Sequence, residues 1–180
     1  MAFKRLFIGT FVDNTLFKPY WDELQLEFNK VLKGKWTELE NLHFTYKFLG
    51  NVNEEKIPEI KRYIYRSLKE IDSTIKIGGL GYFPLKGEPQ VLFSKIHNSD
   101  KSIFSHFNNI ENGLKKIGFK PESKKFFPHI TLIRIKSLSS EFNEIFQEHK
   151  DLQFGLMKSF KINLIESTLT QNGPIYKIIE

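Results

Sequence analysis

The sequence contains no cysteine, which excludes disulfide bonds, thiolate nucleophiles and zinc sites built from cysteine. It also lacks any apolar run near the ~18 residues that a membrane-spanning helix requires. The opening stretch MAFKRLFIGTFVDN carries a basic pair and apolar residues, but Asp13 ends the apolar run and no small-residue cleavage site follows. This stretch favours a first strand over a signal peptide, and we expect a cytoplasmic protein without a membrane anchor.

No low-complexity linker divides the 180 residues, so we expect one domain over residues 1–180. Lys and Arg number 27 against 21 Asp and Glu, which gives a net charge of +6. This excess favours anionic partners, nucleic acid among them, but many soluble proteins are as basic without such a partner. The 18 Phe residues can fill a core and still leave rings for a binding cleft.

The spacing of apolar residues predicts an alternation of strands and helices. Strands are expected over 3–12, 43–50, 73–84, 90–98, 126–135, 157–169 and 174–179. Helices are expected over 15–34, 53–71, 100–118 and 139–150. Pro58 moves the expected start of the second of these helices toward residue 57. The order helix, strand, helix, strands occurs twice, which is a weak internal repeat. We therefore expect an α+β fold of two pseudo-symmetric lobes, each an antiparallel sheet with outer helices, with a cleft between them.

A His-x-Thr triplet occurs twice, as His43 and Thr45 in LHFTYKFLG and as His129 and Thr131 in FPHITLIR. Residues i and i+2 of a strand share a face, so each pair points one way. Two such strands facing a cleft would bring together two imidazoles and two hydroxyls. One neutral and one protonated imidazole can act as base and acid, and hydroxyls can donate to an anion. This set predicts displacement at phosphorus without a metal or other cofactor.

Other interpretations of the histidines are weaker. A single His-x-Thr is common as a structural feature, but two copies in matched apolar strands favour a shared function. Two histidines could also bind zinc, yet no carboxylate or third histidine stands beside them at a ligand-like spacing. His97, His106 and His149 are interpreted as structural or surface residues.

The paired motifs resemble the signature of the two-histidine (2H) phosphoesterase superfamily, in particular the bacterial and archaeal RNA 2′,3′-cyclic phosphodiesterases, also called 2′-5′ RNA ligases. KRLFIGTFV and INLIESTLTQNGPIYKII are similar to the opening strand and closing hairpin of that family. The family usually has Leu where this chain has Tyr46, whose side chain we expect to face away from the cleft.

The resemblance implies a bilobal fold, no metal, and hydrolysis of an RNA 2′,3′-cyclic phosphate to a 2′-phosphate. It implies that His43 protonates the departing 3′ oxygen, that His129 activates water, and that Thr45 and Thr131 hold non-bridging oxygens. In reverse, the same groups would carry out 2′-5′ RNA ligation. The two histidine roles exchange with direction, so the sequence alone does not fix which His is the acid.

One further residue of interest stands five positions after each His. Arg134 matches an Arg of the family and could neutralise phosphate charge, and Phe48 could stack on a nucleobase. Strict alternation puts both on the face opposite their own His, so a role in the cleft requires a β-bulge or sharp twist after each Thr. By the same alternation Lys47 shares the face of His43, and we expect it as a solvated lysine at the cleft rim. Lys124 and Lys125 precede the second motif and are equally ambiguous.

Two alternatives to RNA-end hydrolysis stay open at this point. The same chemistry could act on another cyclic phosphate, such as an ADP-ribose derivative. The chain could also be a non-catalytic module that binds RNA ends, although a pure binder has no need of a proton donor and acceptor together. In either case we expect a monomer.

Overall fold

The structure is a computed structural model that describes residues 2–67, 70–171 and 173–179. Its strands are β1 (Phe3–Phe11), β2 (Leu32–Trp36), β3 (His43–Asn53), β4 (Glu70–Phe83), β5 (Val91–His97), β6 (His129–Leu138), β7 (Gln153–Lys161), β8 (Asn163–Thr170) and β9 (Gly173–Ile178). Its α-helices are α1 (Lys18–Asn29), α2 (Ile57–Ile64), α3 (Ser102–Lys115) and α4 (Phe142–His149). Short 3-10 turns cover Asn14–Leu16, Leu39–Asn41, Glu54–Lys56 and Tyr65–Ser67.

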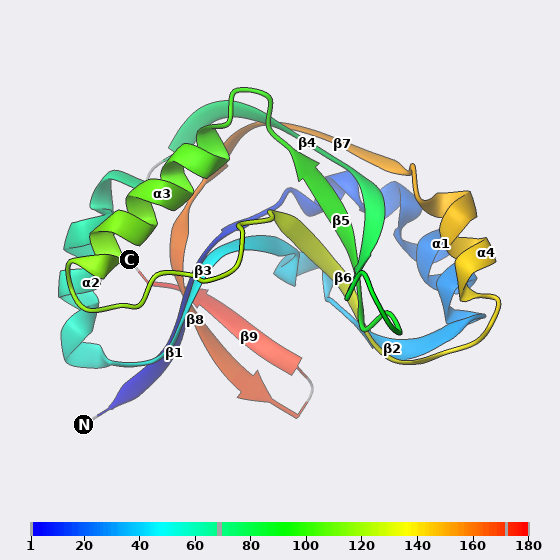
Figure 1. Cartoon of the computed structure of the whole chain (residues 1–180), viewed down its shortest axis with the longest axis horizontal. Helices are drawn as coiled ribbons and strands as arrows, with labels where there is room; N and C mark the ends of the chain where they lie inside the picture. Colours follow the sequence, from blue (N-terminus) through cyan, green and yellow to red (C-terminus); the bar gives the residue numbers. More distant parts are fainter. Residues whose placement is uncertain (1, 68–69, 172, 180) are drawn as a thin grey trace.

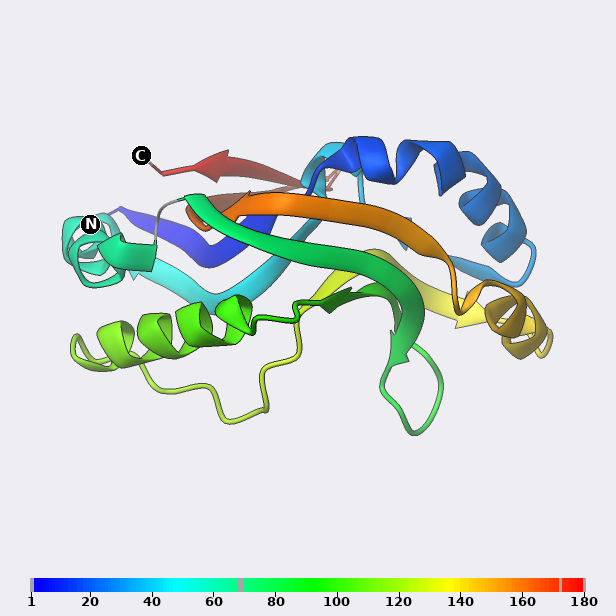
Figure 2. The same cartoon turned by 90° about the horizontal axis from the view of Figure 1, so that it is seen from above.

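The strands form two antiparallel sheets, as Figures 1 and 2 show. The first sheet has the order β3-β1-β8-β9, and the second has the order β2-β6-β5-β4-β7. The two orders correspond strand by strand when β3 is matched with β6 and β1 with β5, and β2 is then an extra strand beyond β6. Each H-x-T strand therefore pairs with the corresponding neighbour, and the expected α+β fold of two similar lobes is confirmed.

The helices gather in two pairs at opposite ends of the molecule. Helix α2 packs against α3 beside the first sheet, and α1 packs against α4 beside the second sheet (Figure 1). In the first pair, α2 follows the H-x-T strand β3 and α3 precedes the H-x-T strand β6. In the second pair, α1 precedes β3 and α4 follows β6. Apolar side chains of both sheets and all four helices form one buried cluster. No helix in the described ranges is both long and apolar enough to cross a membrane.

The first predicted helix is too long, and the strand β2 was missed. Helix α1 ends at Asn29, and the chain then enters β2 at Leu32 instead of continuing to Gly34. Gly34 lies opposite Ile135 at the edge of the second sheet, where an added Cβ would clash with the Arg134 carbonyl oxygen. Long-range pairing with β6 therefore decides the structure of a segment whose local spacing is helical.

Pairing also corrects the second predicted helix and the predicted strand over 157–169. Helix α2 begins at Ile57, as Pro58 indicates, but β4 already starts at Glu70 because that residue pairs with Lys161 on β7. The segment over 157–169 is not one strand, because β7 ends and β8 begins around Ile162 and the chain changes sheets there. The closing hairpin of β8 with β9 is confirmed.

Candidate active site

Strand β3 carries the first H-x-T pair and interrupts its alternation directly after it. Against β1 its register skips Tyr46, which is the extra residue of a β-bulge. Tyr46 and Lys47 are therefore consecutive and both buried, and the exposed Phe48 returns to the face of His43. The Phe7 ring on β1 lies 5.0 Å from the His43 ring and 5.9 Å from the Phe48 ring.

Strand β6 repeats this geometry around the second H-x-T pair. Against β5 its register skips Leu132, so that Leu132 and Ile133 are both buried. Arg134 is exposed and returns to the face of His129. The predicted bulge after each Thr is confirmed in both strands, and it places Phe48 and Arg134 on the faces of their own histidines.

The two imidazoles are anchored in the same way. His43 Nδ1 lies 2.6 Å from the carbonyl oxygen of Asn41, and His129 Nδ1 lies 2.8 Å from that of Phe127. A carbonyl oxygen only accepts, so Nδ1 carries the proton in both rings and Nε2 is the nitrogen left for a ligand. This bond persists whether Nε2 is protonated or not, so neither ring must reorient during a proton transfer.

Aromatic rings surround each imidazole. The ring centroids nearest to His43 are those of Phe7 at 5.0 Å, Tyr176 at 5.0 Å and Phe11 at 6.1 Å. Those nearest to His129 belong to Phe83 at 5.2 Å, Phe93 at 5.2 Å and Phe127 at 6.1 Å. The rings restrict the orientation of both imidazoles and exclude water from them. This loss of hydration is the main cause of the lowered pKa values of the two histidines.

Burial lowers the pKa of both histidines below its ordinary value. For His43 the positive charges of His129 and Arg134 act in the same direction, and the hydrogen bond to Asn41 opposes them. For His129 the charge of Arg134 again lowers the pKa, and the hydrogen bond to Phe127 opposes it. One guanidinium therefore acts on both imidazoles, which places the two histidines and Arg134 in one electrostatic neighbourhood.

Thr45 and Thr131 are partly exposed and share the faces of their histidines. Thr45 lies opposite Gly9 of β1, where a Cβ would stand 2.9 Å from the Phe44 carbonyl oxygen. Because Gly9 has no side chain, the Phe44 carbonyl and the Phe7 ring can pack closely against β1 beside Thr45. The structure thus brings together the predicted histidines, threonines and Arg134, with Phe48 beside them.

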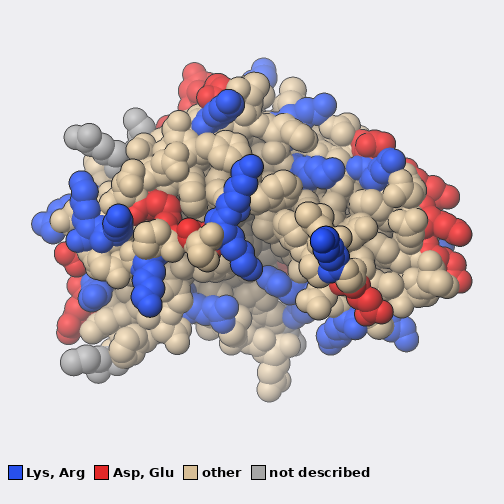
Figure 3. Space-filling model, viewed as in Figure 1, with Lys and Arg blue, Asp and Glu red and all other residues tan. Residues whose placement is uncertain are grey.

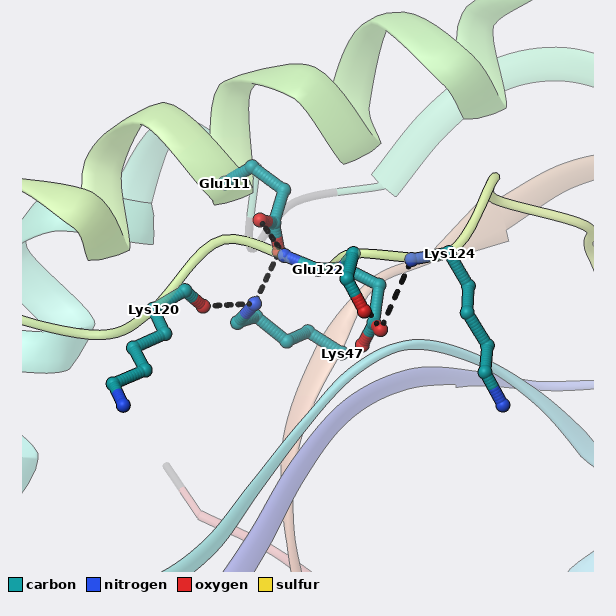
Figure 4. A network of polar contacts seen from close by, with 6 residues as sticks. Lys47, Glu111, Lys120, Glu122 and Lys124 are labelled. Atoms are coloured by element: carbon teal, nitrogen blue, oxygen red, sulfur yellow. Dashed lines mark hydrogen bonds and ion pairs between the residues drawn. The ribbon is translucent and has the colours of Figure 1, made fainter.

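Lys47 is not the solvated rim lysine that alternation predicts. The bulge turns it to the back of β3, where its side chain is only 6% exposed and its Nζ lies 2.6 Å from Glu111 Oε1 on α3. Lys47 Nζ also donates to the Lys120 carbonyl oxygen at 2.9 Å, and the Glu122 backbone N–H donates to Glu111 Oε2 at 2.8 Å (Figure 4). This buried ion pair fastens the segment over 119–128, which leads into His129, to the strand that carries His43.

Tyr46, the bulged residue, holds the same segment by packing. Its ring stacks on Phe126 with centroids 5.8 Å apart, and Phe126 stacks on Phe107 of α3 at 4.2 Å. Burial raises the pKa of the Tyr46 phenol, so it stays neutral. The prediction that Tyr46 faces away from the cleft is confirmed, and its position ties the two H-x-T strands together.

Basic side chains border a hollow near the middle of the molecular face shown in Figure 3. Lys124 and Lys125 are exposed on the segment that precedes His129. In Figure 4 the side chains of Lys120 and Lys124 extend away from α3, on the side of the β3 and β1 ribbons. This distribution suits an anionic ligand with charge on both sides of a reacting group.

Tyr176 is the site residue that sequence reasoning missed. It lies on β9, far from either motif in the sequence, and its ring meets the His43 ring edge-on at 5.0 Å. Burial raises the pKa of its phenol, and the positive charges of Arg134 and Arg5 oppose that rise. The alternation in PIYKII predicts a strand that contains Tyr176, but it does not show which strand lies beside it. The sheet order is what places β9 in the sheet that carries His43.

The remaining histidines lie elsewhere. His97 ends β5, His106 lies on α3, and His149 ends α4 with Nδ1 2.9 Å from the Ile145 carbonyl oxygen. Across the described ranges 2–67, 70–171 and 173–179, no three His, Cys, Asp or Glu side chains gather as ligands of a metal ion would. The site offers imidazole, hydroxyl, guanidinium and aromatic groups, which suit proton transfer beside a bound anion.

Comparison with known sequences gives a consistent family. The family model described as LigT like Phosphoesterase matches residues 18–93 and 97–176. An Aquifex aeolicus protein named RNA 2′,3′-cyclic phosphodiesterase is 33% identical over 183 residues, which cover 100% of this chain and 97% of the relative. A Methanocaldococcus jannaschii protein of the same name is 37% identical over 152 residues, covering 83% of this chain and 84% of the relative.

Solved structures share the fold over nearly the whole chain. A crystal structure of a Thermus thermophilus protein has a TM-score of 0.79 at 26% identity, covering 98% of this chain and 95% of that one. Escherichia coli LigT complexed with 3′-AMP also has a TM-score of 0.79, at 18% identity, covering 99% of this chain and 97% of that one. At the lower identity the likeness shows the fold alone.

Proposed function

The chain belongs to the LigT-like phosphoesterase family, and from this premise we propose that it hydrolyses RNA 2′,3′-cyclic phosphate ends to 2′-phosphates. The observation that carries the proposal is the duplicated strand geometry. Both H-x-T strands have a bulge after Thr, an Nδ1–H bond to the carbonyl two residues earlier, and an imidazole under the charge of Arg134. The names of the A. aeolicus and M. jannaschii relatives support the substrate class.

The reaction needs one proton acceptor and one proton donor on opposite sides of phosphorus. Nε2 of His129 takes a proton from water as the water oxygen bonds to phosphorus. Nε2–H of His43 gives its proton to the 3′ oxygen as the phosphorus–O3′ bond breaks. The product carries a 2′-phosphate and a free 3′-hydroxyl, and the enzyme returns to its starting state when a proton passes from His129 to solvent and another reaches His43.

The groups around the histidines support charge development in this step. The Thr45 and Thr131 hydroxyls donate to the non-bridging oxygens, and Arg134 balances the negative charge that grows on them. Phe48 stacks on the terminal base, and Tyr176 closes the side of His43. Ligation would use the same proton roles with the 5′-hydroxyl of another strand in place of water. Its oxygen bonds to phosphorus as Nε2 of His129 takes its proton, and the phosphorus–O3′ bond breaks with a proton from His43, which leaves a 2′-5′ linkage. The roles exchange only when that linkage is cleaved back to the cyclic phosphate.

The test is incubation of the purified protein with a short RNA ending in a 2′,3′-cyclic phosphate, in the presence of EDTA. We expect ring opening to a 2′-phosphate, identified by ³¹P NMR and by mass, at a rate that chelation does not lower. A cyclic phosphate of an ADP-ribose derivative, assayed in parallel, measures the competing substrate class.

Three results would contradict the proposal. They are binding of the RNA without turnover, a rate that EDTA abolishes and a divalent ion restores, and faster turnover of the ADP-ribose derivative than of RNA. A 3′-phosphate product would keep the chemistry but reverse the substrate in the cleft and exchange the assigned roles of His43 and His129.

A further inference from the structure

The cleft face of the first sheet extends beyond His43 toward the beginning of β1. Phe3, Arg5 and Phe7 are alternate residues of β1, paired with Asn53, Asn51 and Phe48 of β3, so they share one face. The Phe7 ring lies 5.0 Å from the His43 ring, which identifies this face as the cleft face. Phe3 and Arg5 are both exposed on it.

Strand β3 has a second register shift against β1, and this shift keeps Asn51 and Asn53 on the same face as Phe48. The register steps over Leu49, so that Asn51 lies opposite Arg5 and Asn53 opposite Phe3. Directly opposed residues of an antiparallel pair share a face. Asn51 and Arg5 are therefore exposed neighbours on the cleft side.

Two large rings on this face point into solvent. Phe48 is 65% exposed and Phe3 is 62% exposed. Phe3 begins β1 and Phe48 lies on the edge strand β3, so both rings are accessible. Exposed rings on a sheet face are the arrangement on which single-stranded nucleic acid stacks its bases. Arg5 lies between Phe3 and Phe7 along β1, and Phe7 is paired with Phe48. A cation therefore lies between the two exposed rings.

The charges nearby leave Arg5 available for an anion. Lys4, which points to the opposite face, takes both neighbouring carboxylates, Glu166 at 3.1 Å and Glu54 at 3.8 Å. In the part of the chain that the structure describes, no carboxylate forms an ion pair with Arg5. The positive charge of Arg5 also reaches the Tyr176 phenol beside His43, so this cation is continuous with the catalytic cleft.

We propose that Phe3, Arg5 and Asn51 form a subsite for the nucleotides that precede the cyclic phosphate end, an inference that rests on the proposed function. The terminal base stacks on Phe48, an upstream base stacks on Phe3, and Arg5 with Asn51 binds a phosphate of the strand between them. Four residues of β1 span about 13 Å, several times the ~3.4 Å base repeat of a stacked strand, so the base on Phe3 is not the immediate neighbour of the terminal base. The subsite selects RNA strands over cyclic mononucleotides.

The test compares two substrates, a 2′,3′-cyclic mononucleotide and a tetranucleotide with the same cyclic end. For each variant the readout is the ratio of kcat/KM for the tetranucleotide to kcat/KM for the mononucleotide. We expect Phe3→Ala to lower this ratio about 5-fold or more, the effect of one lost base stack. We expect Arg5→Gln to lower it through KM and to reduce the salt dependence of tetranucleotide binding by about 0.7 in the log–log slope, one phosphate contact.

Two matched controls separate the subsite from general effects. Arg62→Gln removes the same charge from helix α2, where the Arg62 guanidinium lies 5.4 Å from the Tyr63 ring. Tyr65→Ala removes an exposed ring from the 3-10 turn that follows that helix. Both controls should leave the ratio at the wild-type value.

The outcomes distinguish this inference from the proposed function. Equal ratios for Arg5→Gln and Arg62→Gln would reduce the role of Arg5 to net charge, and an unchanged ratio for Phe3→Ala would remove the stacking position. Turnover of neither substrate by the wild-type protein contradicts the proposed function instead. In that case binding of a fluorescent tetranucleotide ending in 2′-phosphate decides the subsite alone, because weaker binding by Arg5→Gln and Phe3→Ala than by the controls supports it and equal binding overturns it.

Discussion

Strands β3 and β6 follow the same backbone path and place different chemistry on it. On the cleft side, the position after the bulge is Phe48 in β3 and Arg134 in β6. On the back, the bulge buries Lys47 in an ion pair in β3, whereas β6 buries Ile133 among apolar side chains. The shared path gives the two histidines equivalent surroundings, and the differences give the candidate site an aromatic side and a cationic side.

This asymmetry has a chemical meaning. A cleft with two identical halves could hold a cyclic phosphate in either of two orientations, with either oxygen facing either imidazole. Under the proposed function, a base on Phe48 and a phosphate against Arg134 would define one orientation, and the departing oxygen would always face the same histidine. The proposal thus assigns regiochemistry to the residues that differ between the strands, and catalysis to those that are the same.

The largest expected effect is loss of either imidazole. His43→Ala and His129→Ala should each lower the single-turnover rate on a cyclic phosphate RNA about 10²–10⁴-fold, the usual contribution of a general acid or base. His97→Ala, at the end of β5, is the matched control and should keep the wild-type rate. Near wild-type turnover by either active-site variant would remove that histidine from its role.

Next in size is the difference between the two buried residues behind the bulges. Lys47→Met leaves Glu111 buried without its cation, so it should lower the free energy of unfolding by about 3–5 kcal/mol. Ile133→Val at the corresponding place should lower it by only about 0.5–1.5 kcal/mol. Denaturant unfolding measures both values.

The double variant Lys47→Met with Glu111→Gln sharpens that test. It removes both charges and keeps an acceptor for the Glu122 backbone N–H, so it should regain part of the stability lost by Lys47→Met. A double variant no more stable than the single one would show that the ion pair is not what makes Lys47 important.

The two residues at His plus five should differ in their response to salt. Arg134→Gln should weaken substrate binding about 10- to 100-fold at low salt, with a smaller loss at high salt, because a charged hydrogen bond contributes about 1.5–3 kcal/mol. Phe48→Ala should weaken it by a factor that salt hardly changes, because stacking is not screened. Measuring KM for both variants from low to high salt tests whether Arg134 acts through its charge and Phe48 through stacking. Identical salt responses would argue against these two roles.

The smallest effect concerns pH. The rate should be bell-shaped, because it needs one neutral and one protonated imidazole. Burial and Arg134 lower both histidine pKa values, so the limbs of the kcat/KM profile should lie below the ordinary histidine value of about 6.5. Arg134→Gln removes a positive charge and should move both limbs to higher pH. A shift to lower pH, or a monotonic profile with chemistry rate-limiting, would contradict the electrostatic assignment.

Local patterns were sufficient for the core of the site. The repeated H-x-T motif and its strand context predicted which side chains lie close together. A cleft role for Phe48 and Arg134 required a break in the side-chain alternation, and both strands contain that bulge. Parity failed for Lys47, because the same bulge that returns Phe48 to the cleft turns Lys47 to the back.

The residues that sequence reasoning missed depend on pairing between distant segments. Strand β2 has helical spacing and becomes a strand because the edge of β6 is open to it. Tyr176 reaches His43 only because β8 crosses back to pair with β1. Neither pairing leaves a mark within a window of ten or fifteen residues, so no local pattern could have revealed them.

The first sheet combines two early strands, β1 and β3, with the two late strands β8 and β9, and this order has a consequence for synthesis of the protein. The first sheet needs β8 and β9, which follow the other described strands in the sequence and are therefore synthesised after them, to complete the pairing that begins with β1. Until then His43 lacks the Tyr176 side of its surroundings and β1 has one unpaired edge, which is open to other chains. A chain that lacks β8 and β9 therefore cannot form the complete surroundings of His43.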